Sequence, residues 1–116
     1  MTQVFIGMVD KQTDARHVLL VTVSPAVENV ADLTTGGKPK TLLDWGVDAD
    51  ANAATNLAAL LLSWAFGKIA AGPDHSRVTD KMLDTFTEEV VQHQLHTGKM
   101  WFLSAAQIRA FVPQVQ

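Results

Sequence analysis

The stretch ANAATNLAALLLSWAFGKIAA, residues 51–71, decides the fold more than any other part of the chain. Alanine and leucine are strong helix formers, so this composition predicts a helix. Four less apolar residues, Asn56, Ser63, Gly67 and Lys68, interrupt the stretch, which favours a buried helix over a membrane span. Because apolar side chains recur around much of its circumference, the helix is expected at the centre of the fold: Leu57, Leu60, Leu61, Leu62, Trp64, Phe66 and Ile69.

A second helix is expected after a break at AGPDHS, residues 71–76, where glycine ends one helix and proline prevents its continuation. From about Arg77 to Thr97, apolar residues recur every four positions, and Gly98 is a natural stop. The two segments together predict a helical hairpin.

The N-terminal part predicts a β-hairpin, with strands over 2–9 and 17–23 that are rich in Val, Ile, Leu and Phe. Neither face of the first strand is polar, so we expect both faces to be covered, or one to meet a partner. After Pro25, the segment AVENVADL (26–33) is expected to form one or two helical turns, and TTGGKPK (34–40) a loop.

The C-terminal part predicts a short strand at MWFL (100–103) and a last helix over Ala105–Val112. Ser104 and Gln107 have the spacing of a capping box, which opens such a helix. The predicted fold is therefore a single α+β domain over residues 1–116. A small antiparallel sheet, made of the hairpin and the late strand, packs on a helical hairpin, with a short C-terminal helix.

Composition narrows the classes of function. Nine basic against twelve acidic residues give a net charge of −3, and the basic residues are scattered, which weighs against nucleic-acid binding. Cysteine is absent, which excludes disulfides, thiol nucleophiles and iron–sulfur ligation. The start MTQVFIGMVD lacks the features of a signal peptide, so a cytoplasmic location is expected. No motif indicates a cofactor, and none is expected.

The most singular motif is DWGVDADANAAT, residues 44–55. Its alternating Asp48, Asp50 and Asn52 are like the first ligands of a calcium loop, but the required glycine and glutamate are replaced by alanines. Aspartates before a helix commonly cap its free N–H groups. One or two aspartates suffice for capping, so an acidic surface that contains a tryptophan remains for a basic protein partner. The competing interpretation, which is favoured, is that Trp45 is a core or boundary residue, as most tryptophans are. The candidate contact residues are Asp44, Trp45, Asp48 and Asp50.

Glu89, His93 and His96 stand four and three residues apart on the expected second helix. Such spacing is compatible with a metal site, although three ligands at one helix end are a weak signal. A solvated polar face at a helix C-terminus is the competing interpretation, and it is favoured. No metal is therefore expected.

Four segments, LLDWG (42–46), NLAALLL (56–62), FTEEVV (86–91) and WFLSAAQIRAFV (101–112), occur in an order that resembles an uncharacterised family of small bacterial and phage proteins. The family pattern contains an aromatic-acid-Trp-Gly-Tyr element, a Leu-Ala helix and a closing Trp-x-Leu-Ser/Thr-x-x-Glu/Gln-Ile. Leu43 and Val47 depart from it, since they replace the aromatic residue and the tyrosine. The resemblance implies a bacterial or mobile-element origin and no known activity. The matching residues are Asp44, Trp45, Gly46, Trp101, Leu103, Ser104, Gln107 and Ile108.

The leading hypothesis is a non-enzymatic interaction protein, encoded by a phage or mobile element, that binds a host protein or complex and regulates or inhibits it. A homodimer is a further hypothesis, because the hairpin lacks a polar face. The alternative is a small acid–base or metal-assisted enzyme that uses the loop aspartates or the histidines. A nucleic-acid-associated protein comes third.

Overall fold

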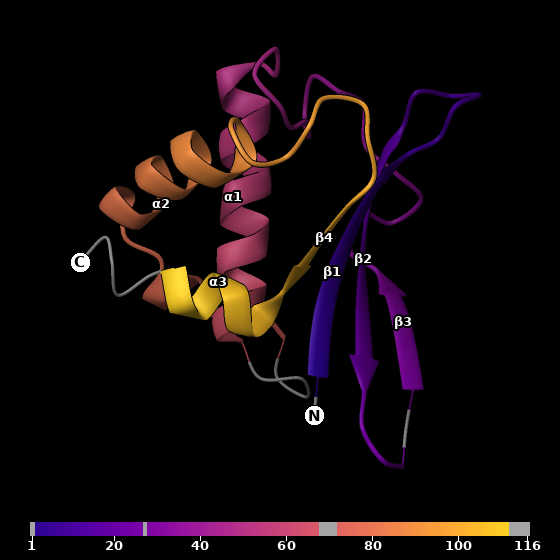
Figure 1. The fold of residues 1–116 in the computed structure, drawn as a ribbon, viewed down its shortest axis with the longest axis vertical. Coiled ribbons are helices and arrows are strands. Elements are labelled where there is room, and N and C mark those ends of the chain that lie inside the picture. The colour runs from indigo at the N-terminus through magenta and orange to yellow at the C-terminus, as the bar shows by residue number, and fades with distance from the viewer. Residues whose placement is uncertain (1, 27, 68–71, 112–116) are drawn as a thin grey trace.

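The chain folds into an antiparallel sheet with helices on one of its faces (Figure 1). The computed structural model describes residues 2–26, 28–67 and 72–111. The sheet has four strands in the order β3-β2-β1-β4. Its strands are β1 (Thr2–Val9), β2 (Arg16–Val23), β3 (Glu28–Asp32) and β4 (Trp101–Ser104). The predicted α+β class is confirmed, as are the N-terminal hairpin and the late strand.

The register of the sheet follows from the alternation of side chains along β1. Val4 lies between Val21 of β2 and Ser104 of β4, and Phe5 lies between Leu20 and Leu103. Phe5 and Leu20 are buried on the inner face, against the helices. The neighbouring Val4 therefore points to the opposite face.

The expected helical turns at residues 26–33 are wrong, because Glu28–Asp32 forms the strand β3. Val30 pairs with Val21 and Ala31 with Leu20 in an antiparallel register. The intrinsic helix propensity of such a short segment is weak, and the pairing with β2 overrides it. Residue 27 lies outside the described residues.

The central helix, α1, spans Ala51–Phe66 and lies between the sheet and α2 (Figure 1). Half of its residues are buried, which confirms its position at the centre of the fold: Ala53, Ala54, Leu57, Ala58, Leu61, Leu62, Ser63 and Ala65. It ends earlier than expected, because Gly67 is already extended. A side chain at Gly67 would lie 2.2 Å from the carbonyl oxygen of Gly72, so only glycine fits this close approach. Residues 68–71, over which the helix was also expected, lie outside the described part.

The expected second helix is present, but it is shorter than 77–97 and not regular throughout. A short 3-10 helix, η1 (His75–Arg77), precedes α2 (Asp80–Phe86), which begins after Thr79 caps the amide of Met82. A π-helical turn, η2 (Thr87–Val91), follows, and turns lead from it to Gly98. The wider turn lets the adjacent Val90 and Val91 both enter the core.

The last helix, α3, spans Ala105–Phe111. Its capping box is confirmed, since Gln107 N–H donates to Ser104 Oγ at 3.0 Å and Ser104 N–H donates to Gln107 Oε1 at 2.8 Å. Residue 112, the expected end, is not described. No helix in the described ranges has the length and apolar character needed to cross a lipid bilayer.

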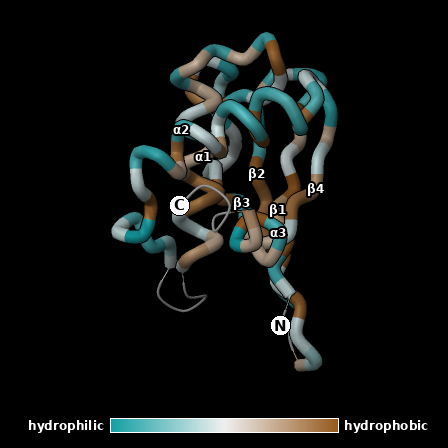
Figure 2. The backbone as a smooth tube through the Cα atoms, turned by 60° about the vertical axis from the view of Figure 1, so that its left-hand side comes forward, coloured by the Kyte–Doolittle hydropathy of each residue, from teal (hydrophilic) through white to brown (hydrophobic). Residues whose placement is uncertain are grey.

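The two faces of the sheet have different environments. The inner face packs on α3, shares the hydrophobic core with α1 and carries buried residues such as Phe5, Val18 and Trp101. The side chains that alternate with them form what we call the outer face, over which Figure 1 shows no helix. Figure 2 shows the apolar character of β1 and β2. The apolar residues of the outer face are Val4, Ile6, Met8, Leu19, Val21, Val23, Val30 and Phe102.

Candidate functional site

The acidic loop, residues 44–50, begins with an aspartate that is almost fully buried. Asp44 Oδ1 lies 3.3 Å from Arg16 Nε and accepts the backbone N–H of Trp45 at 2.9 Å. Removing a carboxylate from water is costly unless it is paired in this way. Asp44 therefore fixes the loop to the start of β2.

Arg16, the partner of Asp44, was not predicted from the sequence. Its side chain is buried, and its Nη1 also lies 2.8 Å from a carboxylate oxygen of Asp14 and donates to the Asp14 carbonyl. Its backbone pairs with Lys38 in an isolated bridge. The sequence contained one signal for this buried cation, which was its position at the start of an apolar strand.

Trp45 is fully buried, which agrees with its interpretation as a core residue and not with a place at the binding surface. Its ring packs edge-on against Trp101, with centroids 5.6 Å apart and planes at 89°. Its indole N–H donates to the carbonyl of Lys99 at 3.1 Å. In this conformation Trp45 holds the loop to the core and cannot contact a partner.

Gly46 also attaches the loop to the helical layer, because its N–H donates to the carbonyl of Val91 at 2.9 Å. With φ of +97°, and Thr97 Oγ1 only 2.0 Å from where a Cβ would stand, the position requires glycine. The next two residues face solvent: Val47 is 70% exposed and Asp48 is also exposed. The tip of the loop is thus presented on a fixed base.

Asp50 is the helix cap that the capping interpretation requires. Its Oδ2 accepts the N–H groups of Asn52 at 3.0 Å and Ala53 at 3.3 Å, at the start of α1. This geometry satisfies free donors of the first helical turn. Asp50 therefore has a structural role, whatever else binds nearby.

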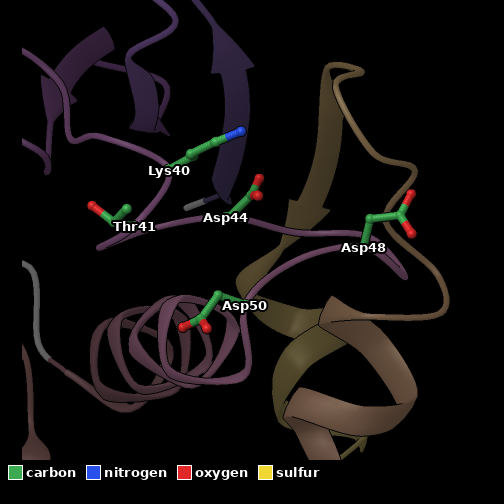
Figure 3. Close-up of a pocket in the computed structure, with 5 residues that line it drawn as sticks. All are labelled: Lys40, Thr41, Asp44, Asp48 and Asp50. Carbon is green, nitrogen blue, oxygen red and sulfur yellow. The ribbon is translucent and has the colours of Figure 1, made fainter.

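An open cleft of about 320 Å³ is lined by Lys40, Thr41, Asp44, Asp48 and Asp50. Figure 3 shows the Asp50 carboxylate against the start of α1 and the Asp48 carboxylate pointing away from the other two aspartates. The three carboxylates do not converge on one point. In the part of the chain that is described, no group of three or more Asp, Glu or His side chains is placed to hold a metal ion.

Glu89, His93 and His96 do not share a helix face, because the π-helical turn and the turns after it replace the expected helix. All three side chains are exposed. The ring of His93 contacts the backbone carbonyl of Glu88. The structure therefore does not bring these three candidates together.

The outer face is the largest exposed apolar feature of the sheet. Phe102 is 59% exposed and Val30 is 57% exposed, and Val21, Val4, Leu19 and Ile6 connect them across the sheet as half-buried residues. Apolar patches of this kind commonly mark protein interaction sites. The sequence contained the signal, the missing polar face of the hairpin, but it did not indicate β3, which extends the surface together with the expected strand β4.

Two carboxylates lie at the margin of this face, on β3. Asp32 pairs with His17 at 3.3 Å between Nδ1 and Oδ2. Desolvation raises the pKa of Asp32, but hydrogen bonds from Thr34, Gly36 and His17 outweigh it and lower the pKa to about 2. Asp32 is therefore ionised at neutral pH. The second carboxylate is that of Glu28.

No family model, curated protein or solved structure matches this chain. The resemblance to small bacterial and phage proteins therefore stays a prediction.

Proposed function

We propose that this chain is a non-enzymatic protein-interaction module that binds another protein chain through its outer face. The observation that carries the proposal is the exposure of Phe102 and Val30 at the two edges of a continuous apolar surface. Burying such a surface against another protein removes it from water, which is the main driving force of association. Aromatic residues like Phe102 are enriched at interfaces relative to the rest of the protein surface.

The proposed partner is a host protein or complex that binding regulates or inhibits, in the cytoplasm of a bacterium that carries the gene on a phage or mobile element. Support for this setting comes from the sequence resemblance alone. A basic partner would meet the exposed carboxylate of Asp48 beside the cleft. The buried Asp44 is less available to such a partner, because Arg16 already occupies it.

The enzyme alternative has less support from the geometry. Asp44 is paired with a cation and Asp50 accepts two backbone N–H groups, so neither is poised as a free acid or base. Nucleic-acid binding has less support as well, since the outer-face positions of the four strands contain carboxylates and no lysine or arginine.

The test is capture of partners from a bacterial host with the tagged protein, followed by mass spectrometry. The double variant Val30→Lys/Phe102→Lys introduces charge on the outer face. The matched control Leu42→Lys/Val47→Lys changes charge equally at exposed apolar residues outside the sheet. Circular dichroism must show that both variants fold.

We expect a specific partner to be lost with the outer-face variant and retained with the control, and the purified partner to repeat this result in calorimetry. A partner retained by both variants would refute the proposed surface. Loss with the control variant or with Asp48→Asn alone would assign binding to the acidic loop instead.

A further inference from the structure

We infer that the outer face binds a second copy of this chain, so that two sheets pack face to face in a dimer. The inference rests on the proposed function and names the partner at the same surface. A host protein that binds this face would then compete with the second copy.

The outer face has an apolar centre. Val30, Val21 and Val4 form one apolar row across three neighbouring strands, and the next row contains Leu19, Ile6 and Phe102, with Asp32 at its β3 end. Apolar sheet faces pack on one another about 10 Å apart in β-sandwiches. In a two-fold dimer each patch meets an identical patch, and the apolar centre of the face is complementary to itself.

The distribution of charge on the outer face favours one orientation of the dimer. Glu28 and Asp32 both lie on β3, at one margin of the face. A two-fold axis parallel to the strands places β3 over β4 of the second copy, and β4 contains only Trp101, Phe102, Leu103 and Ser104. An axis across the strands would place β3 over β3 and bring carboxylates together. We therefore assign the first arrangement.

The same charges argue against dimerisation through the β3 edge of the sheet. Antiparallel pairing of β3 with a second β3 about Val30 would place Glu28 opposite Asp32 in both halves of the ladder. Like charges directly opposite one another destabilise a strand pair and protect an edge from association. The face is thus a better contact between copies than the β3 edge.

The size of the face sets the expected strength. Four strands about 4.8 Å apart, each about six residues long at about 3.3 Å per residue, define roughly 400 Å² in projection. A standard interface buries about 800 Å² of accessible surface per partner. Corrugation and the margins add area, but the interface is small. We therefore expect a dissociation constant on the order of micromolar to tens of micromolar.

The test is sedimentation equilibrium of the purified full chain from about 1 µM to about 1 mM, a range that brackets this affinity. We expect a monomer–dimer equilibrium for the unmodified protein and for Leu42→Lys/Val47→Lys. Val30→Lys/Phe102→Lys should dissociate at least about 100-fold more readily, because each copy loses the apolar contacts of two side chains and must desolvate two ammonium groups. Both variants must keep the circular dichroism spectrum of the parent.

A monomer at about 1 mM would overturn the dimer. If Val30→Lys/Phe102→Lys nevertheless lost a captured partner, the proposed function would stand. If this variant retained the partner, both proposals would fail. A dimer that resists Val30→Lys/Phe102→Lys, or that Leu42→Lys/Val47→Lys also disrupts, would overturn the inference as well.

Cross-linking tests the orientation, because the chain contains no cysteine of its own. A mixture of Val30→Cys and Phe102→Cys proteins should cross-link with a short bis-maleimide more efficiently than Val30→Cys protein alone. The reverse result would overturn the arrangement of β3 over β4.

Discussion

Arg16 Nε and Asp44 Oδ1 lie 3.3 Å apart, and both side chains are almost completely removed from solvent. The pair joins β2 to a loop 28 residues later in the chain. Asp14, which is largely exposed, also contacts the guanidinium. A buried ion pair adds little net stability, but removing one partner leaves the other desolvated and unpaired.

Asp44→Asn should therefore lower the free energy of unfolding by about 3 kcal/mol, at the lower end of the usual range because Asp14 remains beside Arg16. Urea denaturation measures this change. Asp48→Asn, on the exposed loop tip, serves as the control and should change stability by no more than about 0.5 kcal/mol. Equal stability of the two variants would contradict a structural role for the ion pair.

Gly7→Ala should destabilise the sheet through Trp101. A Cβ at Gly7 would lie 2.0 Å from Cε2 of that indole, far inside van der Waals contact. We expect a loss of at least about 2 kcal/mol in chemical denaturation. The double variant Gly7→Ala/Trp101→Leu should lose less than the sum of the single changes, because the smaller side chain leaves room for the methyl group. Strict additivity would show that the contact does not limit the substitution.

Asp50→Ala should cost about 1 kcal/mol, because the N–H groups of Asn52 and Ala53 lose their acceptor. Asp50→Ser should restore most of the stability, since serine caps helices equally well. Affinity for a captured partner should stay unchanged in both variants. A partner that discriminates between Asp50→Ser and the parent protein would show that the carboxylate also takes part in binding.

The stability contributed by Asp32 should depend on pH in the acidic range. Its pKa is lowered from 3.8 to about 2 in the folded protein, so the folded state favours the ionised form. This stabilisation is present above about pH 4 and is lost as the pH falls through the folded pKa. The difference in Tm between the parent and Asp32→Asn should therefore shrink between about pH 5 and about pH 2. A constant difference across this range would argue against the assignment.

Local signals in the sequence predicted the elements that local chemistry determines. The Ala/Leu composition of α1 and the Ser104–Gln107 capping box both depend on residues within one turn or one helix. β3 and the π-helical turn escaped prediction because tertiary contacts decide them. Val30 lies in a strand because it pairs with Val21 of β2. The carbonyl of Val91, at the end of the π-helical turn, accepts the N–H of Gly46 from the acidic loop.

The candidate site shows the same division. The sequence indicated that the acidic loop was unusual and that one aspartate would cap α1, and Asp50 does so. The burial of Asp44 and Trp45 depends on Arg16 and Trp101, which lie far away in the chain. Spacing alone therefore could not distinguish residues that anchor the loop from those that face a partner.

The pairing of β1 with β4 has a consequence for synthesis on the ribosome. Val4 pairs with Ser104, whereas the three strands up to Asp32 are complete early in translation. At 5–20 residues per second, roughly 4–14 s pass between the emergence of β3 and that of β4. During this interval one edge of β1 has no partner strand, and until α1 emerges the apolar inner face has no helix on it, a state prone to aggregation. The nascent chain is therefore expected to need a chaperone more than the finished protein does.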